Sequence, residues 1–153
     1  MAIYLDDLTV GDKAQFGRYE VTREEVIEFA SKYDPQDFHL DDEAAAKGLF
    51  GKIAASGWHT AGMTMRMQVE HWKETGLDKA SLGGAGMDEI RWTRPVYPGD
   101  VLSCETEVLE IKPSRSKPDR GFLKSRWTTF NQNGEPVMTV ITTGILLRRP
   151  KAG

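Results

Sequence analysis

The segment Tyr-Asp-Pro-Gln-Asp-Phe-His-Leu contains the two residues whose types best suit chemistry, Asp34 and His39. A carboxylate and an imidazole that converge on one water molecule can orient it, accept its proton and return a proton to another atom. Pro35 follows the aspartate directly and stiffens a segment that is not helical. Loops of this kind commonly carry function. Taken alone, however, the spacing fits a solvated loop with a helix-capping aspartate better than it fits catalysis.

A second candidate feature lies downstream, where Ser56 and Gly57 begin a long predicted helix. Ser56 is placed to cap this helix, and the amide of Gly57 lies in the first turn, where N–H groups lack a partner within the helix. A free amide at the positive end of the helix dipole suits negative charge that develops on a carbonyl oxygen. A small residue that lets the helix approach another element explains the glycine equally well.

Three helices are expected to position these residues. The first spans residues 22–33, because Thr22 and Glu25 form a capping box and apolar residues follow at helical spacing. The second spans 41–47, with acidic residues in its first turn. The third spans 57–75, where alternating methionines fit a strand, but the length and the absence of turn residues favour a helix buried on most faces.

The second half of the chain predicts an antiparallel meander. Extended segments are expected at residues 87–93, 101–111, 122–132 and 136–147. A turn at residues 97–100, a polar loop at 112–121 and a two-residue hairpin turn at Asn133-Gly134 separate them. The glycines at 83–86 follow no predicted strand and open no helix, so they indicate a flexible approach to the first strand and not a phosphate loop. A long curved sheet around one buried helix gives an α+β fold class.

The composition limits the class of protein. The 153 residues have the length of one domain, and contents of 39% hydrophobic and 28% charged residues are typical of soluble globular domains. A net charge of -3 with scattered basic residues argues against a nucleic-acid partner. With no long apolar run and no signal peptide, we expect no membrane association and a cytoplasmic location. The single cysteine, Cys104, is expected to be a core residue in a reducing compartment.

The segment that holds Asp34 and His39 resembles the hydratase motif of the MaoC-like, R-specific enoyl-CoA hydratases. That motif reads aspartate, any residue, asparagine, proline, an apolar residue and histidine, and Asp34, Phe38 and His39 match it. The family also has a glycine 18 residues after the histidine, whose amide helps to hold the thioester oxygen, and Gly57 stands at that spacing. Residues 89–102 look like the family's strand and turn before its long strands. The resemblance thus covers nearly the whole chain.

The sequence departs from the motif in two places. Gln36 and Asp37 stand where the family has asparagine and proline, and Tyr33 precedes the aspartate where glycine is usual. Pro35 can restore the lost rigidity from a neighbouring position. Asp37 adds a negative charge that can perturb the proton affinity of the pair.

The resemblance implies a single MaoC-like hotdog domain over residues 1–153, in which a long curved antiparallel sheet wraps around a central helix, and assembly as a homodimer or higher homo-oligomer. It implies a hydro-lyase of fatty acid metabolism that adds water reversibly to the double bond of a 2-enoyl-CoA thioester to give (R)-3-hydroxyacyl-CoA. No cofactor is expected, since CoA is part of the substrate. The expected catalytic residues are Asp34, His39 and Gly57. The expected substrate-binding residues are Phe38, Ser56, Trp58 and Met63.

Three alternatives stay open at this stage. A hotdog acyl-CoA thioesterase would activate water mainly with one carboxylate and does not require His39. A noncatalytic module that binds an acyl-CoA or an acyl-carrier thioester would keep the fold without turnover. A metal site is disfavoured, because the available oxygen and nitrogen ligands are irregularly spaced and lack a cysteine; they are Asp34, Asp37, His39, Asp41, Asp42 and His59.

Overall fold

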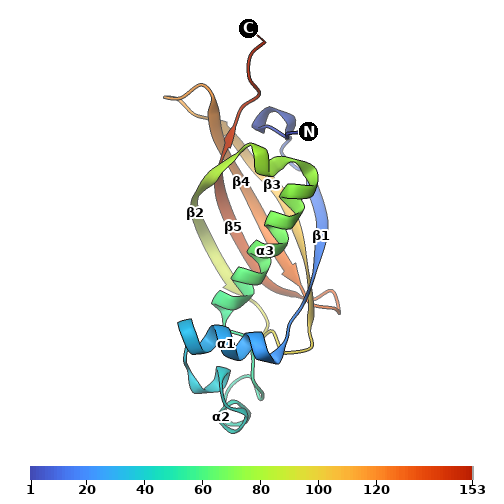
Figure 1. Cartoon of the computed structure of the whole chain (residues 1–153), viewed down its shortest axis with the longest axis vertical. Coiled ribbons are helices and arrows are strands. Elements are labelled where there is room, and N and C mark those ends of the chain that lie inside the picture. The colour runs from blue at the N-terminus through green and yellow to red at the C-terminus, as the bar shows by residue number, and fades with distance from the viewer. Residues whose placement is uncertain (153) are drawn as a thin grey trace.

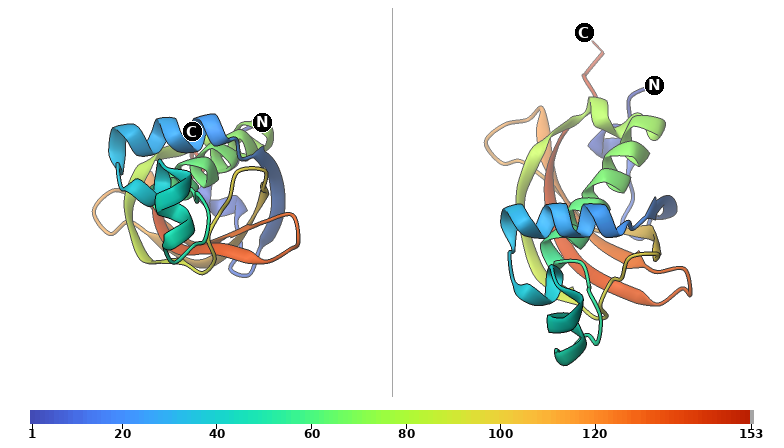
Figure 2. Two further views of the ribbon diagram at one scale, coloured as in Figure 1. Left: turned by 90° about the horizontal axis from the view of Figure 1, so that it is seen from below. Right: turned by 60° about the horizontal axis from the view of Figure 1, so that its bottom comes forward.

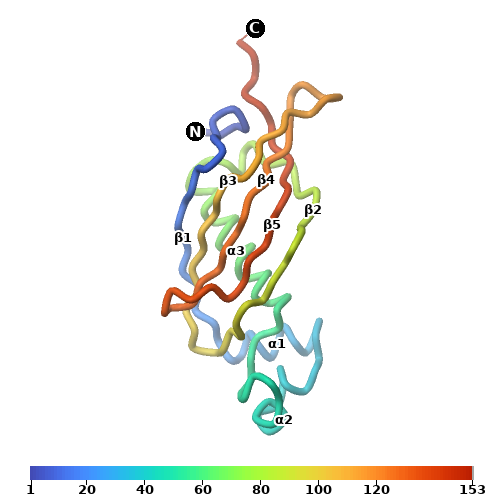
Figure 3. The backbone as a smooth tube through the Cα atoms, turned by 180° about the vertical axis from the view of Figure 1, so that it is seen from behind, coloured from blue at the N-terminus to red at the C-terminus, as the bar shows by residue number. Residues whose placement is uncertain are grey.

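The computed structural model describes residues 1–152, in which a five-stranded antiparallel sheet curves around one long helix, α3 (Figure 1). The sheet order is β1-β3-β4-β5-β2, as the view from behind shows (Figure 3). The strands are β1 Lys13–Glu20, β2 Ser81–Trp92, β3 Val101–Pro113, β4 Arg120–Phe130 and β5 Pro136–Leu147. The helices are α1 Arg23–Tyr33, α2 Asp42–Lys47 and α3 Gly57–Thr75, with short 3₁₀ turns η1 Leu5–Asp7, η2 Asp37–His39 and η3 Leu77–Lys79.

Each α-helix begins where the sequence predicts, because a polar side chain accepts a hydrogen bond from the first turn. Thr22 caps α1, Asp41 caps α2 and Ser56 caps α3. The long α3 ends at Gly76, which takes the left-handed conformation with φ of 94°. Helices α1 and α2 lie at the end of the molecule where α3 begins, and both chain termini lie at the opposite end (Figures 1 and 2).

The main core lies between α3 and the concave face of the sheet. Met63 and Met67 of α3 are 2% and 1% exposed and pack with Leu102 and Cys104 of β3. Burial raises the pKa of the Cys104 thiol to about 12, so this cysteine is an apolar core residue, as predicted. Met65, on the opposite face of α3, is partly exposed, so the expectation of a helix buried on most faces is only partly right.

Strand β1 was not predicted from the sequence; it pairs with β3 and completes the sheet. A register shift between Phe16 and Tyr19 marks a bulge in this strand, where Gly17 has φ of +86°. Two further expectations were wrong. The glycines at 83–86 lie inside β2, and the β4–β5 connection, residues 131–135, is longer than a two-residue turn. Within residues 1–152, no helix is long and apolar enough to cross a membrane.

The bulge generates a prediction for stability. At Gly17 an added Cβ would lie 2.7 Å from the Met67 Sδ atom and the backbone has positive φ, whereas Gly11 has φ of +95° with no atom within 4 Å of an added Cβ. Gly17→Ala is therefore expected to lower the free energy of unfolding by about 2 to 4 kcal/mol, from strain plus overpacking, and Gly11→Ala by about 1 to 2 kcal/mol from strain alone. Urea unfolding measures both. Equal losses would contradict the packing argument.

Candidate active site

Asp34 and His39 are brought together by the tight turn that ends α1. Asp34 is the C-cap residue of that helix, and its amide donates to the Ala30 carbonyl oxygen at 2.9 Å. Pro35 cannot continue the helix, so the chain folds back through η2. The imidazole Nε2 of His39 comes to 3.3 Å from the Asp34 Oδ2 atom. The structure thus places the predicted pair side by side.

A backbone contact fixes the proton arrangement of His39. Its ring is 4% exposed, and Nδ1 lies 2.6 Å from the Ala54 carbonyl oxygen. A carbonyl oxygen only accepts hydrogen bonds, so Nδ1 must carry the hydrogen. In the neutral imidazole, Nε2 then has a lone pair that faces Asp34. Nε2 is therefore the atom that can accept a proton.

The Asp34 carboxylate accepts hydrogen bonds at both of its oxygens. Ser56 Oγ donates to Oδ2 at 2.7 Å, and the Gln36 side-chain amide donates to Oδ1 at 2.6 Å. Burial alone would raise the pKa of Asp34, but the hydrogen bonds from Ser56 and Gln36, with the nearby His39, outweigh burial and hold this pKa below its ordinary value. Gln36, which departs from the family motif, thus helps to keep the carboxyl group ionised.

Gly57 presents a backbone donor beside this pair. It is the first residue of α3 and directly follows Ser56, and its N–H group has no acceptor among residues 1–152. The indole ring of Trp92, at the end of β2, lies against it: an added Cβ at Gly57 would be 2.4 Å from Trp92 Cε2. Position 57 therefore excludes any side chain. The amide has the unsatisfied hydrogen that an oxyanion donor requires.

The four residues expected to bind substrate have different surroundings. Phe38 meets the His39 ring edge-on, with centroids 4.5 Å apart, and belongs to the wall of the site. Trp58 is 61% exposed and forms a T-shaped pair with Trp92 at 5.4 Å. Ser56 is fully buried with its hydroxyl directed to Asp34, and Met63 lies in the main core cluster.

Two of the carboxylates considered as metal ligands make other contacts. Asp41 caps α2 through Ala44, and Asp42 pairs with Arg23 at 2.9 Å. Across the described part of the chain, no group of three or more His, Cys, Asp and Glu side chains is arranged to hold a metal ion.

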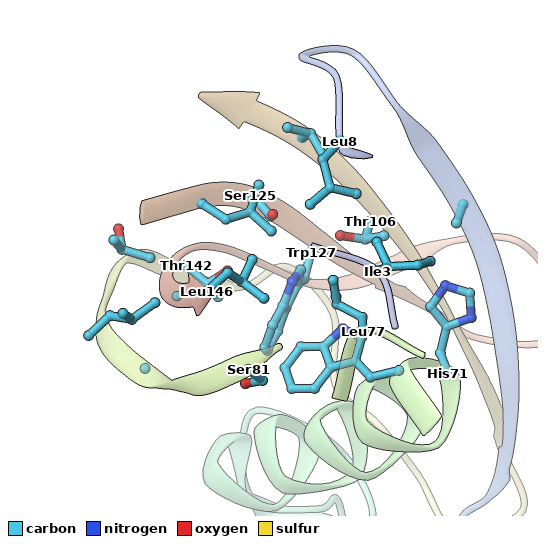
Figure 4. Close-up of a pocket in the computed structure, with 18 of the residues that line it drawn as sticks. Ile3, Leu8, His71, Leu77, Ser81, Thr106, Ser125, Trp127, Thr142 and Leu146 are labelled. Atoms are coloured by element: carbon cyan, nitrogen blue, oxygen red, sulfur yellow. The ribbon is translucent and has the colours of Figure 1, made fainter. Parts of the chain in front are cut away.

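A cavity of about 540 Å³ lies at the other end of α3, between its second half and the sheet (Figure 4). Trp72, Trp127 and Leu146 contribute apolar walls, with hydroxyl groups of Thr106 and Ser125 among them. Neither Asp34, His39 nor Gly57 lines it. The cavity was not predicted, because it depends on how far the sheet curves away from α3.

Two further contacts of the site were not predicted from the sequence. The hydrogen bond from Ser56 to Asp34 joins residues 22 positions apart, and Trp92 reaches Gly57 from a different strand. The sequence predicted that Ser56 caps α3, but it did not predict that the Ser56 hydroxyl donates to Asp34. The one sequence signal for Trp92 was its position near the end of a predicted strand, which the other tryptophans lack.

The long α3 inside a curved antiparallel sheet confirms the predicted α+β hotdog fold. The structure is similar to a MaoC-like dehydratase from Rhodospirillum rubrum, with 43% identity and a TM-score of 0.87, covering 98% of this chain and all of that one. It is also similar to the R-hydratase PhaJ1 of Pseudomonas aeruginosa, with 28% identity and a TM-score of 0.70, covering 99% of this chain and 89% of that one.

Residues 7–124 match the model of the MaoC-like domain, and the chain belongs to this family. The uncharacterized protein YdeM of Bacillus subtilis is 33% identical over 128 residues, which cover 84% of this chain and 87% of YdeM. The family predicted from the sequence is thereby confirmed. That residues 1–153 form a single domain stays a prediction.

The hydrogen bond from Ser56 to Asp34 can be tested against a matched helix cap. Ser56→Ala removes a cap and a donor to the carboxylate, whereas Thr22→Ala removes only the α1 cap. We expect Thr22→Ala to cost about 1 kcal/mol of unfolding free energy and Ser56→Ala about 2 to 3 kcal/mol at pH 7. NMR titration of the Asp34 carboxyl carbon should show its pKa rising in Ser56→Ala and unchanged in Thr22→Ala.

The pH dependence of this loss has a defined sign. The folded pKa of Asp34 lies below its ordinary value, so the ionised carboxyl group stabilises the fold above about pH 4, and this stabilisation disappears as pH falls through the folded pKa. The extra cost of Ser56→Ala should therefore shrink in acid. A cost that is the same at pH 3 and pH 7 would show that the serine acts only as a cap.

Proposed function

We propose that this protein adds water reversibly to the double bond of a 2-enoyl thioester and forms the (R)-3-hydroxyacyl thioester. The observation that carries the proposal is the 3.3 Å approach of His39 Nε2 to Asp34 Oδ2, with the Nδ1 hydrogen committed to Ala54. Both atoms are then hydrogen-bond acceptors. One water molecule that lies to the side of both atoms can donate a hydrogen to each, which directs its lone pairs outward at a substrate carbon.

The roles of the two residues follow from their surroundings. Asp34 is a weak base because its pKa is lowered, so it orients the water, and His39 Nε2 takes the proton. The water oxygen bonds to C3 while the π electrons move toward C2 and the thioester oxygen. The protonated His39 then returns the proton to C2. Both new bonds form on the face that the pair occupies, so the addition is syn.

Gly57 is proposed to hold the thioester oxygen. Its N–H group lies at the positive end of the α3 dipole and next to Ser56, which contacts Asp34. Negative charge that reaches the carbonyl oxygen during addition would be stabilised by this amide. The similarity to an R-hydratase supports hydration that gives the R product. We propose CoA as the carrier of the acyl group, and an acyl-carrier protein is the alternative carrier.

Variants of the pair test the proposal with crotonyl-CoA, whose conjugated double bond absorbs in the ultraviolet. Asp34→Asn and His39→Ala are expected to lower kcat by about 10² to 10⁴, since each removes one partner in general acid-base catalysis. Glu28→Gln is the matched control, because this exposed carboxylate of α1 makes no side-chain hydrogen bond or ion pair among the described residues. Chiral analysis of the product should give the R isomer.

Other results would separate the alternatives. Release of free CoA in place of hydration would identify a thioesterase. Tight binding of enoyl-CoA without turnover would identify a noncatalytic module. Near-wild-type hydration in both variants would show that the pair is not catalytic.

We also propose that the reaction needs no cofactor. The proposed steps use two side chains, one backbone amide and water. Activity should therefore be unchanged after dialysis against a chelator, and activity that returns only with added metal would contradict this proposal.

A second copy of the chain is the proposed partner of the β2 edge. Large apolar side chains are exposed on this edge strand, with Leu82 at 45%, Met87 at 52% and Trp92 at 42%. An exposed apolar edge strand favours association, and antiparallel pairing of β2 with its copy would make a closed, two-fold dimer. We therefore propose a homodimer.

Charge on β2 tests the dimer. Met87→Lys is expected to convert a dimer to monomer at micromolar concentration, because it puts two like charges near the two-fold axis. Val10→Lys changes an apolar residue of similar exposure outside the sheet and should leave the dimer intact. Sedimentation velocity measures both. A monomeric wild type would rule out this interface.

A further inference from the structure

A second carboxylate and histidine pair joins three elements beside the candidate site. The Glu25 Oε1 atom of α1 accepts hydrogen bonds from the Tyr19 hydroxyl of β1 at 2.5 Å and from His59 Nε2 of α3 at 3.0 Å. No other side chain of the first turn of α3 reaches α1 through a hydrogen bond among residues 1–152. We refer to these three residues as the Glu25 cluster.

The local sequence explains why the Glu25 carboxylate is available. Glu25 lies at the third position of α1, where a capping box would direct its side chain back to the N-cap amide. Only half of this predicted box forms: the Glu25 amide donates to Thr22 Oγ1 at 3.2 Å, but the carboxylate turns to Tyr19 and His59. The bulge at Gly17 shifts the register of β1 just before Tyr19.

His59 is held in one orientation by its surroundings. It is 4% exposed, and its ring stacks on Phe29 of α1 with centroids 4.8 Å apart. Because the Glu25 carboxylate accepts, Nε2 must carry the hydrogen. The buried Nδ1 has no partner among the described residues.

The pKa shifts of Glu25 and Tyr19 agree with these hydrogen bonds. The Tyr19 hydrogen bond lowers the pKa of Glu25 despite its partial burial, and His59 lowers this pKa further. Burial raises the pKa of Tyr19 to about 12, and Glu25 raises it as well. At neutral pH the Glu25 carboxyl group is therefore ionised and the Tyr19 hydroxyl is protonated, so this carboxylate accepts hydrogen bonds from both partners.

The cluster is placed to control the geometry of the candidate active site. Helix α1 carries Asp34 at its end, and α3 carries Gly57 two residues before His59. We propose that His59 is a positioning residue, which holds α1 against the first turn of α3 and so sets the Asp34 carboxylate relative to the Gly57 amide. This inference rests on the proposed hydration. Removing the hydrogen bond should therefore reduce turnover more than it reduces substrate binding.

Two substitutions at His59 separate the hydrogen bond from the volume of the ring. His59→Gln keeps an N–H donor near the position of Nε2, whereas His59→Met keeps apolar volume without a donor. With crotonyl-CoA, His59→Met is expected to lower kcat about 10- to 100-fold, as misplacement of catalytic groups does, with KM changed less than about threefold. His59→Gln should recover most of the lost kcat. His71→Gln, on the same helix but stacked on Phe16, is the matched control and should have wild-type kcat.

A measurement without substrate keeps this inference separate from the proposed function. The amide resonance of Gly57 in ¹H–¹⁵N spectra should shift in His59→Met and return toward wild type in His59→Gln. If wild type hydrates no enoyl thioester, the proposed function fails, and the Gly57 resonance alone still tests whether His59 sets the first turn of α3. If His59→Met does not fold, Glu25→Met removes the acceptor from a half-buried site and should give the same shift and the same loss.

Two outcomes would overturn the inference. One is an unshifted Gly57 resonance with kcat within about twofold of wild type in folded His59→Met, which corresponds to about 0.4 kcal/mol of activation free energy. The other is equal impairment of the glutamine and methionine variants, because the shared hydrogen bond would then be irrelevant.

Discussion

The Asp34 carboxylate is the point on which the candidate site depends. One of its oxygens receives the Ser56 hydroxyl at 2.7 Å and lies 3.3 Å from His39 Nε2, so a single group joins the end of α1, the turn after it and the start of α3. A partly buried charge of this kind is stable only while its donors stay in place. The same contacts that satisfy the charge also fix the directions in which the imidazole and the first α3 amide point.

Local signals were sufficient for much of this arrangement. The three capping residues are followed by helices with the expected bounds, and α1 ends at Tyr33, as predicted. These features are determined within one or two turns of chain, where side-chain chemistry and backbone geometry act directly. The family motif then identified which loop mattered, since five-residue spacing of an acid and a histidine is not specific by itself.

The contacts that the sequence did not predict join distant residues. Strand β1 has only weak alternation and acquires its structure by pairing with β3, more than eighty residues later. Glu25 fits a capping box from its local sequence, yet its carboxylate binds Tyr19 and His59, because a half-buried hydroxyl and a buried imidazole offer stronger hydrogen bonds than a solvent-exposed amide does. Which hydrogen-bond partner such a side chain takes depends on the packed structure, and a single sequence does not give that packing.

The close contact between Gly57 and Trp92 has a consequence for how such proteins can diverge. An added Cβ at position 57 would lie 2.4 Å from the indole ring, so no other amino acid fits there while the tryptophan keeps its place. A smaller residue at position 92 would make room but would also remove the T-shaped contact with Trp58. Descendants of this chain are therefore expected to change the two positions together or to change neither, although 35 residues of sequence separate them.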